Sequence, residues 1–442
     1  MKTIMHGEKR LAVSFELFLF FFIIFTPLFY ASVTPLPLTI VQLSSFCLLL
    51  LLILKVWLSS KIIYPSYTGI IIIFIALGVF QIIPLPVFLL KAISPKTFII
   101  YQQYALRAGS GGFLQLSFYS LVSKEEIIKF ISFLIIFFAA LNTIEKKKQF
   151  ERLFLGIIFY GLILSFYGII KKYFILEKQI THSFSTFGNS NHFAGYMLMV
   201  ASLAIGYAVS LQNKSKKLIF GFIAAIICAT IFLSLSRAGS FALIFSLTLM
   251  LFLLMREGMI KKIYWVIGIA LILAGIFVFV AGFEPIKFKF LHLVQDWLVR
   301  FTLAKDALRI IKDFPLFGVG WGNFRYIYPH YQTIPTFPAY FDYLHNDHLQ
   351  LMVEMGLVGY FLYFLFLFKI FRNIFIELSK RRDPFVKGIV LGGACGLFGV
   401  ILHNLVDFDF HIPAIYFLFW LILALIYRCV HTHFHNDQQE AK

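Results

Sequence analysis

The sequence predicts an all-α fold, a polytopic transmembrane helical bundle. Hydrophobic residues make up 60% of the 442-residue chain, and charged residues make up only 14%. Apolar runs recur along the chain, each close to the roughly 20 residues that an α-helix needs to cross a bilayer. The connections between the runs are short, apart from one stretch at about 283–349. These observations favour one bundle of membrane-spanning helices with a single larger loop.

The apolar runs define about twelve spans with the length of transmembrane helices. In chain order they cover 11–30, 37–58, 66–90, 125–143, 153–170, 192–211, 218–235, 238–255, 263–282, 350–371, 388–405 and 413–430. The first run follows Lys2, Lys9 and Arg10, which is the charge order of a signal sequence, but no convincing cleavage site comes after it. We therefore expect it to remain as the first span.

Basic residues gather in alternate loops, and this pattern predicts the orientation in the membrane. They lie at 146–152, 214–217, 256–262 and 380–382. Loops rich in Lys and Arg stay on the cytoplasmic side, so these loops and both termini are expected there. The net charge of +18 is then explained by orientation and by anionic lipid headgroups, and not by nucleic acid.

The main polar motifs fall in the opposite, extracytoplasmic loops. The residues His345, Asn346, Asp347 and His348 stand directly before the apolar run at 350–371. Asn346 or Asp347 can cap the helix that follows, and an imidazole can take a proton from an attacking hydroxyl near neutral pH. The alternative is a histidine that only caps or packs. His348 and His345 can form a pair of metal ligands, but no third ligand has a suitable spacing.

Two arginines and a second polar cluster lie in other external segments. Arg237 stands at the tip of a tight hairpin, SLSRAGS, and Arg300 stands at the flank of a predicted amphipathic helix. Guanidinium groups suit phosphate, although an arginine that reaches from a helix end to the membrane surface gives the same pattern. Asn189, Asn191 and His192 begin a span, where helix capping explains them equally well.

The long loop is expected to hold the amphipathic helix and an irregular cap. The helix stops before Pro315, and its apolar stripe predicts a position at the membrane surface. That stripe is formed by Val294, Trp297, Leu298, Phe301, Ala304, Leu308 and Ile311, with Lys305 and Lys312 intruding on it. The glycines of GVGWGNF follow no strand, so a nucleotide site is not predicted, and we expect a tight turn with Trp321 at the membrane interface. The aromatic segment 326–343 suits a cap, and DFDFH at 407–411 is interpreted as supporting structure.

No cofactor and no metal site are predicted from the residues. The four cysteines all lie in apolar runs, so neither a disulfide framework nor a cysteine metal site is indicated. His431, His433 and His435 follow the last span and are expected on the cytoplasmic side, away from the other motifs.

Taken together, the motifs resemble those of the O-antigen ligase and polymerase superfamily of bacterial envelope glycosyltransferases. His345 and Asn346, nine residues, Gly356, two residues and Gly359 fit the ligase signature of a histidine, a small polar residue, a spacer and paired glycines. FGNSNHFAGY, SRAGS, the Arg300 helix leading to PLFGVGWGNF, and HNLVDFDFHIP follow in the order of the family. The resemblance covers about residues 180–425, and Ala304 departs from it where relatives often have an aromatic residue.

The resemblance implies a metal-independent, inverting transfer of a glycan from undecaprenyl diphosphate to an acceptor hydroxyl, such as that of lipid A-core. The reaction would occur at the periplasmic face of the bacterial inner membrane. His345 would be the catalytic base or would orient the acceptor, and Arg237 and Arg300 would hold the diphosphate. Further candidates for support are Asn189, Asn191, His192, Asn346, Asp347 and His348. The chain would divide into N-terminal helices (1–179), a catalytic membrane region (180–425) and a cytoplasmic tail (426–442).

Three alternatives stay open. A polymerase of carrier-linked repeats and a protein O-oligosaccharyltransferase differ from a ligase in the acceptor and not in how the donor is activated. A transporter belongs to another class, and it typically has charged residues near the midplane of its spans, internal repeats or broken helices. Here the spans are nearly free of charge, with Glu16 and Glu354 as the main exceptions, and no repeat is evident. The expected partners are therefore the carrier-linked glycan, its acceptor and membrane lipids.

Overall fold

The computed structural model describes residues 2–59, 61–104, 112–175, 183–259, 268, 293–333 and 341–434. Its helices are α1 (Lys2–Phe25), α2 (Leu28–Ala31), α3 (Pro35–Ser59), α4 (Thr68–Ile82), α5 (Val87–Ile93), α6 (Pro95–Tyr104), α7 (Ser120–Thr143), α8 (Lys147–Ile170), the π-helix η2 (Lys171–Ile175), α9 (Ser190–Ser210), α10 (Lys214–Leu233), α11 (Arg237–Arg256), α14 (Leu293–Asp313), α15 (Phe324–Tyr331), α16 (Asp347–Ser379), α17 (Pro384–His403), the 3-10 helix η4 (Asp409–His411) and α18 (Pro413–His431). Two short strands, β1 (Leu85–Pro86) and β2 (Phe113–Leu114), pair antiparallel.

The predicted polytopic helical fold is confirmed. Within the described residues, nine helices are long and apolar enough to cross a membrane, and 11–25 and 68–82 form two shorter apolar helices. The predicted run at 263–282 lies outside the described residues. The predicted run at 66–90 is longer than its helix, because α4 ends at Ile82 before two prolines, Pro84 and Pro86, which cannot donate a backbone hydrogen bond.

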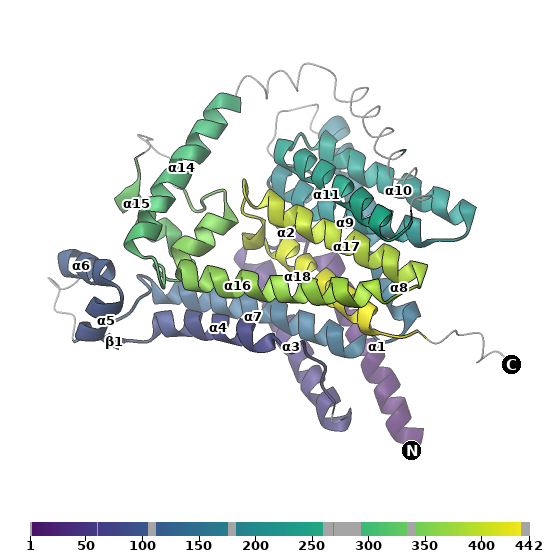
Figure 1. Cartoon of the computed structure of the whole chain (residues 1–442), viewed down its shortest axis with the longest axis horizontal. Helices are drawn as coiled ribbons and strands as arrows, with labels where there is room; N and C mark the ends of the chain where they lie inside the picture. Colours follow the sequence, from purple (N-terminus) through teal and green to yellow (C-terminus); the bar gives the residue numbers. More distant parts are fainter. Residues whose placement is uncertain are drawn as a thin grey trace.

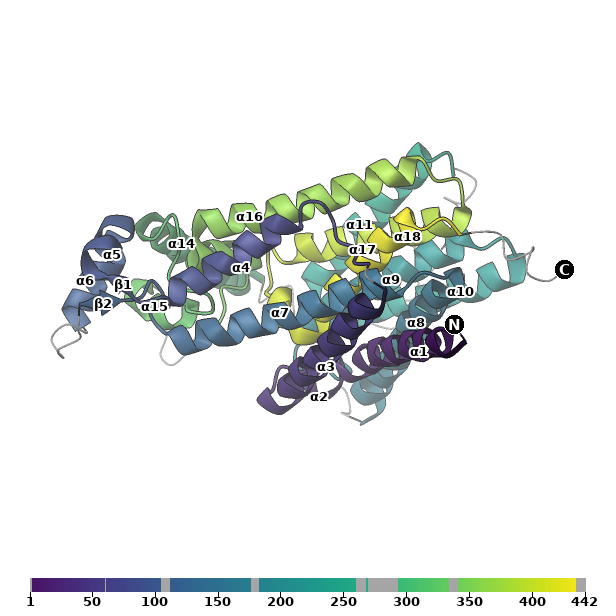
Figure 2. The same cartoon turned by 90° about the horizontal axis from the view of Figure 1, so that it is seen from below.

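The bundle is elongated, with its ends clearly different (Figure 1). Helices α5, α6, α14 and α15 gather at one end, and the start of α1 and the end of α18 lie toward the other, as the second view also shows (Figure 2). The end that carries α14 and α15 is also the end where the polar motifs gather.

Helix α9 forms the centre of the bundle, and its residues from His192 onward are buried. It packs on α17 through glycines at close approach: a Cβ atom on Gly206 or Gly392 would collide with the backbone of the other helix. Small residues at such contacts let membrane helices approach closely. The segment 404–412, which joins α17 to α18, therefore starts and ends on the buried centre of the molecule.

Helix α16 is broken at Gly356, which has φ 67° and ψ 179°. The segment 315–320 supplies the hydrogen-bond partners that the broken helix lacks. The N–H groups of Leu357 and Val358 donate to the carbonyls of Pro315 (2.8 Å) and Leu316 (3.3 Å), and the N–H of Gly320 donates to the carbonyl of Glu354 (3.1 Å). The sequence did not predict this break. The break explains why a glycine occupies position 356, the first of the paired glycines.

Helix α14 confirms the predicted amphipathic helix. Most of the predicted stripe faces outward, as a position at the membrane surface requires, with Trp297 54% and Phe301 70% exposed, whereas Ile311 is buried. The helix also has a second apolar face, which its periodicity did not predict. Leu303, Ala307 and Ile310 on this face are fully buried in a cluster with residues of α15 and α16.

The predicted position of Trp321 at the membrane interface is wrong. Its side chain is 7% exposed and lies edge-on to Phe74 (ring centroids 5.1 Å) and against Phe130 (5.3 Å). The turn that carries it is held inside the bundle by Gln81, whose Oε1 accepts the N–H of Trp321 (3.0 Å). The segment after this turn was expected to be an irregular cap, but residues 324–331 form a regular helix, α15.

Candidate functional site

The start of α16 presents His345 in a strained backbone conformation. His345 has φ 53°, which a side chain with a Cβ atom rarely adopts and which is found mostly where surrounding structure enforces it. The next residue, Asn346, caps the helix, because its Oδ1 accepts the N–H of Leu349 (3.0 Å). Of the two expected caps, Asn346 is therefore the one used.

Asp347 is turned away from the helix end and binds the segment 404–412. Its Oδ1 lies 2.7 Å from His411 Nδ1, and its Oδ2 accepts the N–H of Phe410 (2.8 Å). Its own N–H donates to the carbonyls of Asn404 (2.9 Å) and Asp407 (3.1 Å). Burial lowers the pKa of His411, but the Asp347 carboxylate outweighs this effect and raises that pKa above its ordinary value. The segment and the start of α16 thus form one rigid unit.

His345 faces a buried carboxylate within this unit. Its Nδ1 lies 3.8 Å from Asp407 Oδ1, and the Asp407 side chain is fully buried while that of His345 is 32% exposed. Burial raises the pKa of Asp407, but the imidazoles of His345, His192 and His403 lower it more, so the carboxyl is ionised at neutral pH. A buried carboxylate beside a partly exposed imidazole is the arrangement that stabilises a histidine when it accepts a proton.

A second histidine pair extends the cluster to α9 and α17. Asp409 Oδ1 lies 3.3 Å from His192 Nδ1, and its Oδ2 lies 2.6 Å from His403 Nδ1. Gly195 permits this contact, because a Cβ atom there would overlap the Asp409 carboxylate. His192, predicted as a supporting residue, is therefore brought to the same segment as His345.

Four members of this cluster, His403, Asp407, Asp409 and His411, are not among the predicted site residues. The sequence predicts only a supporting role for DFDFH, because no partner is visible along the chain. The available signal was chemical: carboxylates and imidazoles between two strongly apolar spans must be paired when they are buried. Within the described residues, no three His, Cys, Asp or Glu side chains are placed to hold a metal ion.

Arg300 contacts the segment 404–412, and Arg237 stands at the start of α11, beside the start of α9. Arg300 on α14 donates from Nη1 to the carbonyl of Val406 (2.6 Å), and its guanidinium has further N–H donors. Arg237 is the first residue of α11, where Ser236 caps the helix by accepting the N–H of Gly239 (3.1 Å). Gly239 packs against Ala194, the neighbour of Gly195, so the start of α11 lies beside the start of α9. Both helix N-termini favour negative charge.

Some of the predicted supporting residues take other positions. His348 faces α17, with Nε2 2.9 Å from the carbonyl of Ile401, and it stacks on Phe364 (5.1 Å). Asn189 caps α9 by accepting the N–H of Asn191 (2.9 Å). His348 therefore joins two helices and does not form a pair with His345.

The fold and the cluster define a multi-pass helical membrane protein with a buried, paired His and Asp site at one end of the bundle. The sequence model of the O-antigen ligase family matches residues 220–364. This region includes α10, α11, α14, α15 and the first part of α16, and with them Arg237, Arg300 and His345. This match supports the resemblance to the O-antigen ligase and polymerase superfamily that the motifs carry. No curated protein matches the chain.

Proposed function

We propose that the protein is an O-antigen ligase-like inverting glycosyltransferase. It moves a glycan from undecaprenyl diphosphate to an acceptor hydroxyl, that of lipid A-core, at the periplasmic face of the inner membrane. The observation that carries the proposal is the pair of His345 and Asp407. Asp407 lies on the segment that Arg300 also binds, and both His345 and Arg300 lie within the region that matches the O-antigen ligase family.

The chemical step needs a base and a stabilised leaving group. The acceptor oxygen attacks the anomeric carbon from the face opposite the diphosphate, and His345 takes the proton of the hydroxyl. The new bond to the acceptor forms as the bond to the diphosphate oxygen breaks, so the configuration inverts. Asp407 then stabilises the imidazolium from its buried position 3.8 Å away.

The departing undecaprenyl diphosphate carries the negative charge that the bond cleavage releases. Arg237 and Arg300 supply planar, permanently charged donors suited to phosphate oxygens, and the N-termini of α9 and α11 add to the positive potential. In the proposed step these two guanidinium groups stabilise the charge of the leaving diphosphate, as a divalent cation does in other phosphate-binding enzymes. The step therefore requires no metal. The lipid tail enters from the bilayer beside the bundle.

Transfer by purified protein tests the role of His345. The protein in lipid nanodiscs receives carrier-linked glycan and lipid A-core in a buffer that contains EDTA. We expect His345→Ala to lower kcat by about 10²–10⁴-fold, the usual contribution of a general base, with an unchanged melting temperature. His330→Ala, an exposed histidine on α15, is the matched control and should retain full activity. Near-normal transfer by His345→Ala would remove the proposed base.

The acceptor is tested in cells that lack the gene. Long carrier-linked chains that accumulate beside bare lipid A-core support a ligase. Single repeats on the core instead indicate a polymerase, which uses the same donor chemistry. Unaltered lipopolysaccharide would overturn both and direct the search to other polysaccharides, glycoproteins or transport.

A further inference from the structure

A cavity of about 300 Å³ lies next to the cluster, between the start of α7, the turn before α3, α15 and the first part of α16. Its volume is at the lower end of the range for small-molecule sites. Apolar side chains form part of its wall, and charged and polar side chains form most of the rest. No step of the proposed transfer uses these polar groups.

The lining carries four carboxylates and two permanent cations. The carboxylates belong to Glu125, Glu126, Asp342 and Glu354, and the cations belong to Lys129 and Arg325. Each cation already faces a carboxylate of the same lining: Lys129 pairs with Glu126, and Arg325 lies 3.8 Å from Asp342. Glu354 is buried and held by the N–H of Gly322 and the amide of Gln350. Among the described ion pairs, the exposed Glu125 has no cation opposite it, so this part of the wall is negative and disfavours a diphosphate or another anion.

The same groups suit a molecule rich in hydroxyls. Ionised carboxylates accept strong hydrogen bonds from hydroxyl groups, and Lys129 and Arg325 donate to hydroxyl oxygens. The ring of Tyr343 adds an apolar surface against which a flat face of the ligand can pack. Charged acceptors, charged donors and one aromatic ring in a small cavity are the contacts that a short saccharide requires.

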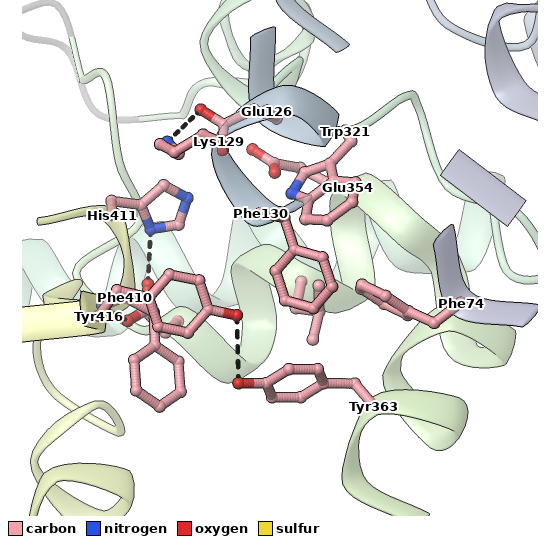
Figure 3. A pocket seen from close by; sticks show the side chains of 12 residues that line it. Phe74, Glu126, Lys129, Phe130, Trp321, Glu354, Tyr363, Phe410, His411 and Tyr416 are labelled. Carbon is pink, nitrogen blue, oxygen red and sulfur yellow. Dashed lines mark hydrogen bonds and ion pairs between the residues drawn. The ribbon is translucent and has the colours of Figure 1, made fainter. Parts of the chain in front are cut away.

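A smaller space with aromatic walls adjoins the cavity (Figure 3). It has a volume of about 50 Å³, and the two spaces share Glu126, Lys129, Glu354 and His411. Its walls are the rings of Phe74, Phe130, Trp321, Tyr363, Phe410 and Tyr416. The shared groups thus mark the boundary between the two spaces, and the smaller space is too small for a sugar ring.

Tyr343 connects the cavity to the proposed catalytic site. Its ring lines the cavity and stacks on Phe408 (ring centroids 4.5 Å, interplanar angle 17°). Phe408 in turn meets His345 edge-on at 4.9 Å. His411 also lines the cavity while it binds Asp347. A ligand in the cavity therefore lies two aromatic rings away from His345.

We infer that this cavity binds a short saccharide that is neutral or carries an amino group, and that it excludes uronic and phosphorylated sugars. The inference rests on the proposed function, in which the saccharide is part of either the acceptor or the carrier-linked glycan. The surplus of carboxylates sets the charge preference, and the small volume of the cavity limits the size of the saccharide that it accepts.

Direct binding tests the inference without any need for transfer. The full-length protein in nanodiscs is mixed with methyl glucoside, methyl galactoside, methyl N-acetylglucosaminide or methyl glucuronide and measured by saturation-transfer difference NMR. We expect a signal from at least one neutral glycoside and a several-fold weaker signal from the glucuronide. Leu38→Trp, which fills the cavity from a half-buried position, should abolish the signal. Absence of any signal, or equal signals in wild type and Leu38→Trp, would overturn the inference.

A conservative variant and a matched control separate binding from folding. Glu125→Gln keeps the shape of an exposed side chain at the start of α7 and should weaken the signal several-fold, whereas Glu145→Gln, an exposed carboxylate beyond the other end of α7, should not. Transfer kinetics then identify the source of the sugar, because Glu125→Gln should raise KM for only one of the two substrates. Binding without transfer in the wild type would reject the proposed function and leave the saccharide cavity standing.

Discussion

Replacing Gly356 by alanine tests the break in α16. Its backbone, with φ 67° and ψ 179°, lies in a region that is almost exclusive to glycine, and forcing another residue into it costs about 1–3 kcal/mol. A Cβ atom there would also collide with the backbone of Leu316 and Phe317. Moving that segment lengthens the hydrogen bonds from Leu357 and Val358, each worth about 1 kcal/mol. The total loss is about 3–5 kcal/mol.

Thermal unfolding of the purified protein in detergent measures this loss. For a chain of this size the expected fall in melting temperature is on the order of 5 °C. Gly69→Ala is the control, because a Cβ atom on Gly69 in α4 meets open space and alanine favours a helix by up to about 1 kcal/mol. It should leave the melting temperature unchanged or raise it. An unchanged melting temperature for Gly356→Ala would refute the argument that the chain needs glycine at the break.

Three further predictions concern the site. Arg237→Lys should lower kcat/KM for the donor by on the order of 10²-fold, because an ammonium group does not reproduce paired phosphate contacts. Arg309→Lys, at a half-exposed position on α14, is the control. A normal donor titration for Arg237→Lys would reject the role of Arg237 in binding the diphosphate. Asp407→Asn should lower kcat by on the order of 10²-fold with little change in acceptor KM, so a change confined to KM would contradict a positioning role. The raised pKa of His411 means that its pair with Asp347 stabilises the fold fully below its ordinary value of 6.5 and loses that effect as pH rises through the folded value. The melting temperature of the wild type should therefore fall from about pH 6 to about pH 9, and that of His411→Asn should change less. Parallel curves for the two proteins would show that the pair of His411 and Asp347 does not stabilise the fold.

Much of the fold could be predicted because bilayer physics acts on local sequence. A run of apolar residues of the right length becomes a helix whatever its neighbours are, so α9, α17 and α18 were expected close to their observed bounds. For α14 the same local reasoning predicted an apolar stripe at the membrane surface, and most of that stripe does face outward. It did not predict the second, buried face, on which Leu303 and Ala307 pack with residues of α15 and α16.

The site could be predicted only in part, because its pairs join distant segments. The apolar run that follows Asn346 identifies this residue as a helix cap, and the short turn between two spans places Arg237 at a helix end. Asp409 has one nearby partner, His403, but its second partner, His192, lies 217 positions away and has no local signal. Its role depends on Gly195, whose missing side chain leaves the room in which the carboxylate sits.

The break in α16 also bears on the order in which the chain can assemble. The backbone groups around Gly356 would be costly to leave unpaired inside a bilayer. Their partners lie at 315–320, which precedes α16 in the chain. The ribosome has therefore synthesised these partners before α16 emerges. The segment 315–320 can therefore already lie at the membrane surface, and it can form these hydrogen bonds as α16 inserts. A chain that lacked this segment would have to insert α16 as two separate pieces, or leave its outer part outside the bilayer.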